Sequence, residues 1–187
     1  MRRKLISAYF TKISLADLPG LVEGAHMNRG MGHKFLKHIS RTKINLFLVD
    51  INGFQLNQKS DQRSAFETVV YLLKELELYD SSLVDKPSIL VLNKMDTEGA
   101  QEKLEEFMGL FGDYENSVKA IEAGWRPEAK AHFRRVFNIS AKTNSNVEEL
   151  CMTIRELIDV LDDKHRAKSE RDGRGTEEKI RVLSDFV

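Results

Sequence analysis

The stretch PSILVLNKMD, residues 87–96, decides the fold of this 187-residue chain. It begins with a proline, continues through branched apolar side chains and ends in the polar tetrapeptide NKMD. A short run that is apolar on both faces is typical of a parallel strand covered by helices on each side. Three further runs of this kind are ISLAD (13–17), INLFLVD (44–50) and the shorter RVFNIS (135–140). Together they predict a mostly parallel sheet.

Apolar residues at helical spacing separate these strands. One set is Phe66, Val69, Val70, Leu73 and Leu76, and a second is Leu104, Phe107, Met108 and Phe111. Strand alternating with helix predicts an α/β fold with helices on both faces of the sheet. Residues 109–134 hold several glycines and a proline among charged residues, and predict an irregular helical insertion.

The clearest helical pattern lies near the carboxyl end of the chain. Its apolar face consists of Val147, Leu150, Cys151, Ile154, Leu157, Ile158 and Leu161. Ser145 and Glu148 have the spacing of a capping box at its start. Because Cys151 falls within this face, we expect it to be a core residue.

Composition excludes several classes of function. The 29 basic and 29 acidic residues balance, so no overall positive field favours nucleic acid. A single cysteine cannot form an internal disulfide, which suits a reducing compartment. No apolar run approaches the ~20 residues of a membrane span. Residues 1–10, MRRKLISAYF, are basic like the start of a mitochondrial transit peptide, but their β-forming residues favour a strand.

Three short motifs follow predicted strands. They are DLPG (17–20), NKMD (93–96) and SAK (140–142). Ligands of open α/β sheets bind at the carboxyl ends of the strands. We therefore expect these motifs to form one site.

The NKMD motif suits recognition of guanine. The base presents two adjacent N–H donors, and the Asp96 carboxylate can accept both, whereas adenine would leave the carboxylate unpaired. Asn93 can bond the base edge and neighbouring loops, and the stem of Lys94 can lie across the ring. The backbone N–H of Ala141 can reach the guanine carbonyl oxygen. The simpler interpretation is a solvated turn, and the buried strand before the motif favours the pocket.

The ordered set DxPG, NKxD and SAK resembles the translation-factor-like GTPases. DLPGLVEGAHMNRGMGHKFLKHISRT (17–42) is similar to the switch region of the Obg family. FLVDINGFQL and KELELYD are similar to its branch in animal mitochondria and nucleoli. The resemblance covers residues from about 5 to 160. It implies a GTP-binding protein that uses GTP or GDP with Mg²⁺, acts in assembly of the large ribosomal subunit and resides in the mitochondrion or nucleolus.

The resemblance also implies roles for individual residues. Asp17 would hold the Mg²⁺ ion, and the N–H of Gly20, after Leu18 and Pro19, would meet the γ-phosphate. Guanine would be bound by Asn93, Lys94, Met95, Asp96, Ser140, Ala141 and Lys142. Many GTPases carry a glutamine after the DxPG glycine to orient the attacking water. Here the residue is Leu21, so slow hydrolysis is expected and no catalytic residue is assigned.

One part of the family pattern is missing from this sequence. No GxxxxGK[ST] loop is present to cradle phosphates. We expect residues 1–161 to form a partial G domain of the Ras-like P-loop fold without its first strand and phosphate loop, and residues 162–187 to form a charged, flexible tail. Losing three or four phosphate hydrogen bonds would cost ~5–10 kcal/mol of binding. The alternative is a non-hydrolysing fragment that acts as an interaction module or does not fold stably.

Overall fold

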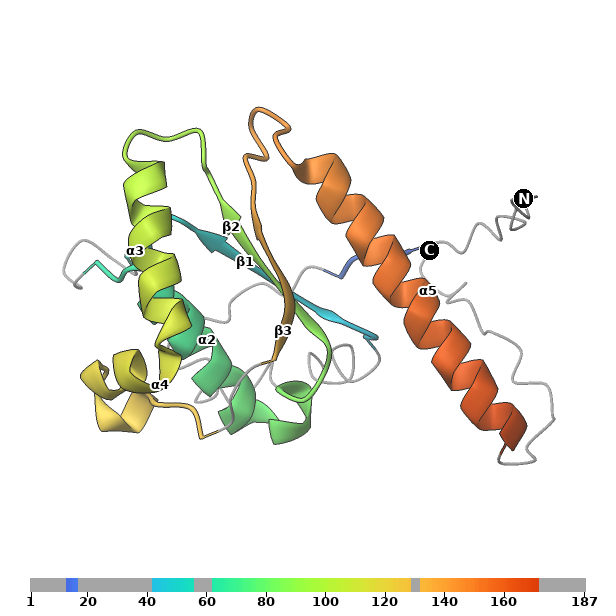
Figure 1. Cartoon of the computed structure of the whole chain (residues 1–187). Coiled ribbons are helices and arrows are strands. Elements are labelled where there is room, and N and C mark those ends of the chain that lie inside the picture. Colours follow the sequence, from blue (N-terminus) through green and yellow to red (C-terminus); the bar gives the residue numbers. More distant parts are fainter. Residues whose placement is uncertain (1–12, 17–41, 56–61, 129–131, 172–187) are drawn as a thin grey trace, which may run out of the picture.

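A computed structural model describes residues 13–16, 42–55, 62–128 and 132–171. Within them the chain forms a three-stranded parallel sheet in the order β1-β2-β3 (Figure 1). Its strands are β1 (Asn45–Asp50), β2 (Ser88–Asn93) and β3 (Phe133–Asn138). The strands predicted at residues 44–50 and 87–93 are thus confirmed. The register places Asp50 beside Asn93, at the carboxyl ends of β1 and β2.

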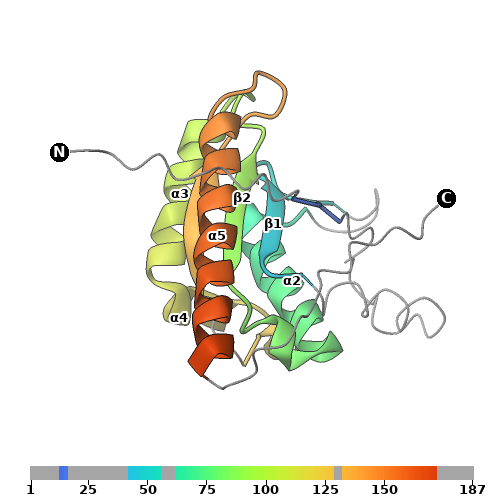
Figure 2. The same ribbon diagram turned by 90° about the vertical axis from the view of Figure 1, so that its right-hand side faces the viewer.

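Helices cover both faces of the sheet. They are α2 (Ala65–Tyr79), η2 (Ser81–Leu83), α3 (Ala100–Gly112), α4 (Tyr114–Ser117), η3 (Val118–Ala120), η4 (Ala123–Trp125) and α5 (Val147–Arg171). In Figures 1 and 2, α2 and α3 lie on one side of the sheet and α5 lies on the other. The described residues therefore form the α/β arrangement that the sequence predicted.

The side chains of β2 alternate between two apolar clusters. Leu90 and Leu92 pack into the larger cluster, between the sheet and helices α2 and α3. Ile89 and Val91 pack into the smaller one, with Leu150 of α5. All four β2 side chains are fully buried, and each such burial is worth ~1.5–3 kcal/mol. This double burial explains why residues 88–92 carry no polar position facing water.

The irregular helical insertion predicted at residues 109–134 is confirmed over residues 114–125, which form a series of short helices. Residues 109–112 instead belong to α3, and residues 133–134 belong to β3. Helices α4, η3 and η4 follow α3 directly. Trp125 of η4 packs against Tyr71 of α2, with ring centroids 5.2 Å apart. The insertion therefore extends the larger apolar cluster beyond the sheet.

Two predicted strands differ from the structure. Residues 13–16, the described part of the run at 13–17, form no strand, and Leu15 is 79% exposed. A strand needs a hydrogen-bonding neighbour, and within the described residues β1 pairs only with β2. The strand predicted at 135–140 begins earlier, at Phe133, and ends at Asn138. It ends there because Ser140 pairs with Ser145 in a separate antiparallel bridge.

The last helix also differs from expectation. Cys151 is exposed, so its assignment to the core was wrong. The buried contact of α5 centres instead on Leu150, and Cys151 lies about 100° around the helix from it. The helix begins at Val147, so the predicted cap Ser145 lies outside the N-cap position. It continues to Arg171, beyond the domain boundary predicted at residue 161.

Candidate functional site

The candidate site lies where β2 and β3 end at one edge of the sheet. NKMD begins at Asn93, the last residue of β2, and SAK follows β3 after one residue. The side-chain oxygen of Asn93 accepts a hydrogen bond from the backbone N–H of Ala141 at 3.0 Å. The backbone N–H of Met95 donates to the carbonyl of Ile139 at 3.1 Å. These bonds join the two motifs directly.

Asp96 is oriented by residues of the SAK motif. The hydroxyl of Ser140 donates to Asp96 Oδ1 at 2.7 Å, and Lys142 Nζ lies 3.6 Å from Oδ2. The hydrogen bond from Ser140 is the main cause that lowers the pKa of Asp96 below its usual range. Ser140 is itself buried and accepts a bond from the backbone N–H of Thr143 at 3.1 Å. Asp96 is therefore a fixed, ionised acceptor at neutral pH.

Lys94 turns in the other direction, toward β1. Its backbone is left-handed, with φ of 68°, and its carbonyl accepts a bond from Thr97 Oγ1 at 2.8 Å. Its Nζ lies 2.5 Å from Asp50 Oδ2, and this bond raises the pKa of Lys94. Burial alone would raise the pKa of Asp50, but bonds from Lys94 and Asn52 outweigh burial and lower it.

The structure thus brings together the seven residues predicted to bind guanine, with one difference in detail. The N–H of Ala141, expected to meet a base carbonyl, is already bonded to Asn93. A base could use this donor only by displacing the Asn93 oxygen. Met95 is partly buried against the larger apolar cluster and serves to anchor the loop.

The predicted phosphate and metal residues cannot be compared with this geometry. Asp17, Leu18, Pro19 and Gly20 lie outside the described residues, as do residues 1–10. Among the residues that the structure describes, no group of three or more His, Cys, Asp or Glu side chains could hold a metal ion. No helix in this same part of the chain has the length and apolarity for crossing a membrane.

The sequence interpretation missed Asp50. It was included only as the end of a strand, although it stands beside Asn93 in the sheet. Placing the two predicted parallel strands side by side, with their carboxyl ends aligned, would have indicated that Asp50 lies beside Asn93.

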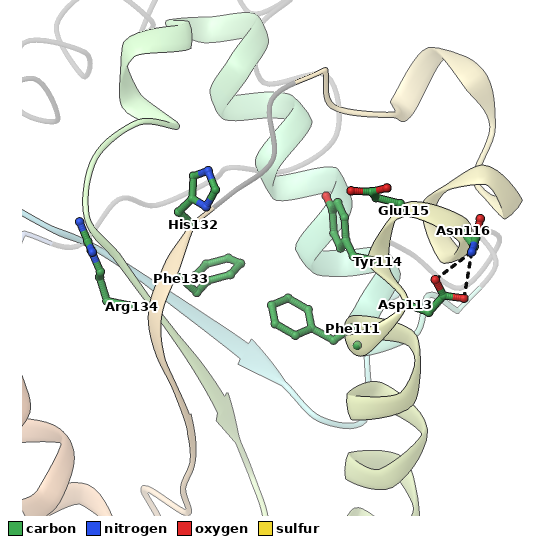
Figure 3. A pocket seen from close by; sticks show the side chains of 9 residues that line it. Phe111, Asp113, Tyr114, Glu115, Asn116, His132, Phe133 and Arg134 are labelled. Carbon is green, nitrogen blue, oxygen red and sulfur yellow. Dashed lines mark hydrogen bonds between the residues drawn. The ribbon is translucent and has the colours of Figure 1, made fainter.

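A separate cavity of about 580 Å³ lies at the opposite end of the sheet (Figure 3). It lies between the end of α3 with α4 and the start of β3. Its wall includes the aromatic rings of Phe111, Tyr114 and Phe133. Because it adjoins the amino end of β3, it is not part of the site formed by NKMD and SAK.

Comparison with known proteins agrees with this architecture. A family model described as "50S ribosome-binding GTPase" matches residues 2–94. GTP-binding protein 10 of Homo sapiens is 49% identical over 156 residues, which cover 83% of this chain and 40% of that protein. The Drosophila melanogaster homologue of GTP-binding protein 10 is 46% identical over 152 residues, 81% of this chain and 40% of that protein. GTPase Obg of Opitutus terrae is 47% identical over 96 residues, 51% of this chain and 26% of that protein.

The sheet, its covering helices and these similarities define the class of the protein as a GTPase-type α/β protein. Within this class, the chain belongs to the Obg family and is a homologue of GTP-binding protein 10. It spans about 40% of the length of the animal relatives that it matches.

Proposed function

We propose that this chain provides the guanine-recognition part of an Obg-type GTP-binding protein. The observation that carries the proposal is the bonding of NKMD to SAK. Asn93 and Asp96, far from SAK in sequence, are held by Ala141 and Ser140 at one edge of the sheet.

Asp96 would select the base. Its carboxylate would accept the two adjacent N–H donors of guanine, and Lys94 would cover one face of the ring. A site built to bond a particular group can reject an analogue that lacks the group by roughly 10⁴ or more. Ser140 and Lys142 would support Asp96, and Asn93 with Ala141 would border the base.

The phosphate side of the proposal rests on family resemblance. Asp17 would hold Mg²⁺, and the Gly20 N–H would meet the γ-phosphate of GTP. With Leu21 in the position of the usual glutamine, hydrolysis would be slow. We propose that the whole protein is a GTP-dependent switch that acts in assembly of the large ribosomal subunit, in the mitochondrion or nucleolus.

Nucleotide titration followed by NMR tests base recognition in the chain as it stands. Guanosine monophosphate should bind in the millimolar range and adenosine monophosphate should bind more weakly, because the probe reads the base pocket without needing a phosphate loop. Asp96→Asn should shift preference from guanosine toward xanthosine monophosphate, whose edge matches an amide. Equal binding of the guanine and adenine nucleotides by the wild-type chain would overturn the proposal.

A second candidate is a chain that acts only as an interaction module. Such a chain would not turn over GTP. Measurable release of phosphate by the purified chain, abolished by Asp96→Asn, would exclude this candidate.

A further inference from the structure

Asp50, at the end of β1, lies beside the NKMD loop (residues 93–96), which we call the guanine-recognition loop. The parallel register pairs Asp50 with Asn93, and the backbone N–H of Ile51 donates to the Asn93 carbonyl at 3.0 Å. The next residue after Asn93 is Lys94, whose Nζ lies 2.5 Å from Asp50 Oδ2. The end of β1 therefore contacts the loop through both backbone and side chain.

The second carboxylate oxygen of Asp50 is held as well. Asp50 Oδ1 accepts bonds from the backbone N–H and the side-chain amide of Asn52, at 2.9 and 3.0 Å. Asn52 is in turn fixed by Lys103 of α3, whose Nζ donates to its Oδ1 at 2.6 Å. The Asn52 amide also donates to Thr97 Oγ1 at 3.1 Å. With both oxygens engaged, the Asp50 carboxylate has a defined orientation.

The Lys94 side chain needs an oriented carboxylate such as Asp50 to hold it in one conformation. This side chain is 57% exposed, and a free lysine side chain loses much of its conformational entropy when it is fixed. Asp96 is the other acid that acts on the Lys94 ammonium. If Lys94 paired with Asp96 instead, it would occupy the carboxylate that the base requires.

We propose that Asp50 is a positioning residue for base recognition. It holds the Lys94 side chain in place for the face of the guanine ring and keeps the ammonium away from Asp96. This inference rests on the proposed function, since it assigns a role within the same site. Asn52 and Lys103 extend it as the support that orients Asp50.

The test is a double-mutant cycle on the full chain, with guanosine monophosphate as the probe and NMR titration as the readout. Asp50→Asn should weaken binding about tenfold, because an ordering cost of ~1.4 kcal/mol is a factor of ten. Lys94→Met should weaken it by a similar factor. The double variant should bind no more weakly than Lys94→Met alone, since Asp50 acts through Lys94.

The matched control is Asp162→Asn. Asp162 forms an ion pair with Lys43, just before the other end of β1, so the same substitution breaks a Lys–Asp pair away from the loop. Its affinity for guanosine monophosphate should equal that of the wild type. If Asp50→Asn gives no cooperative thermal melt, Asp50→Glu replaces it, because the longer side chain keeps the charge but moves the carboxylate from its place beside Lys94. It should weaken binding in the same direction, and wild-type affinity in this variant would overturn the inference.

Three outcomes overturn the inference. The first two are wild-type affinity for guanosine monophosphate in Asp50→Asn and in Lys94→Met. The third is a double variant that binds about tenfold more weakly than Lys94→Met, because Asp50 would then act independently of Lys94 and be purely structural. If the wild-type chain does not distinguish guanosine from adenosine monophosphate, the proposed function fails and this inference fails with it. Selective wild-type binding with no effect of Asp50→Asn overturns this inference alone.

Discussion

Ser140 donates its hydroxyl to Asp96 Oδ1 at 2.7 Å, across 44 positions of sequence. The bond joins the loop after β2 to the turn after β3. Ser140 is held in its turn by Thr143 and by backbone pairing with Ser145. The orientation of the Asp96 carboxylate is therefore a consequence of the sheet, because the two strands must pair before the donor reaches the acceptor.

Ser140→Ala should weaken binding of guanosine monophosphate about three- to tenfold, because Asp96 loses the neutral donor that orients it. NMR titration measures this. Ser145→Ala is the matched control, since Ser145 pairs with Ser140 through its backbone and should bind the nucleotide like the wild type. Equal affinities in the two variants would remove Ser140 from the site.

The same variant should change the pH dependence of stability. The pKa of Asp96 is lowered in the folded chain, chiefly by the hydrogen bond from Ser140, so the ionised Asp96 carboxylate stabilises the folded state. This stabilisation is complete above the pKa that Asp96 has in the unfolded chain, and it is lost as pH falls through the pKa of the folded chain. The stability gap between wild type and Ser140→Ala should therefore be present at pH 7 and narrow below about pH 4. Urea denaturation at both pH values measures the gap. A gap that stays constant would contradict the assigned cause.

Ser64→Ala should destabilise the chain by about 1 kcal/mol, because Ser64 caps α2. Its hydroxyl accepts from the Glu67 N–H at 3.2 Å, and Glu67 accepts from the Ser64 N–H at 2.7 Å. Chemical denaturation provides the measurement. Ser117→Ala is the control, since Ser117 precedes η3 without a side-chain capping bond and should change stability little. A larger loss in the control would show that the cap is not the cause.

The sequence predicted β2, which buries both of its faces, and the positions of β1 and of most of β3. Residues 89–92 could be interpreted from their composition alone, because no polar side chain interrupts them. The run at 13–17 has a similar composition but lacks a strand partner in the described residues, and composition does not indicate partners. Cys151 shows the same limit, since a helical stripe does not reveal how much of it a three-stranded sheet can cover.

In the candidate site, too, the sequence predicts the residues whose role is local and misses those that depend on strand pairing. The NKMD and SAK residues could be proposed from the sequence because the chemistry expected of them is local to each motif. Asp50 could not be, because its contact with Lys94 depends on the register between β1 and β2. The capping box at Ser64 was also missed, although its S-x-x-E spacing is visible in the sequence.

Gly53→Ala should destabilise the chain by more than about 1 kcal/mol. Gly53 closes the turn after β1 with φ of 85°, and an added Cβ would lie 1.9 Å from the carbonyl oxygen of Arg63. Gly109→Ala is the opposite case, because Gly109 lies within α3 with open space around it. It should stabilise the chain by ~0.5–1 kcal/mol. Thermal melts of the two variants should move in opposite directions, and a shared direction would refute the argument.

Tyr114→Phe should leave the chain as stable as the wild type at pH 7, or stabilise it by up to about 1 kcal/mol. The hydroxyl of Tyr114 is buried without a hydrogen-bond partner among the described residues, so its removal costs no bond. The ring itself packs edge-on against Phe111, beside the cavity in Figure 3, and the substitution keeps this contact. Urea denaturation at pH 7 measures the difference. A loss well above 1 kcal/mol would mean that the hydroxyl is bonded in solution.

Alkaline pH provides a second readout for the same variant. Burial, followed by the charge of Glu77, raises the pKa of Tyr114 to about 12. Because the folded pKa lies above the unfolded value, the wild-type chain keeps the proton more tightly when folded, and this stability is lost as pH rises from about 10 toward 12. Tyr114→Phe has no proton to lose there. Its advantage over the wild type should therefore grow across this interval, and an unchanged difference would contradict the burial of the hydroxyl.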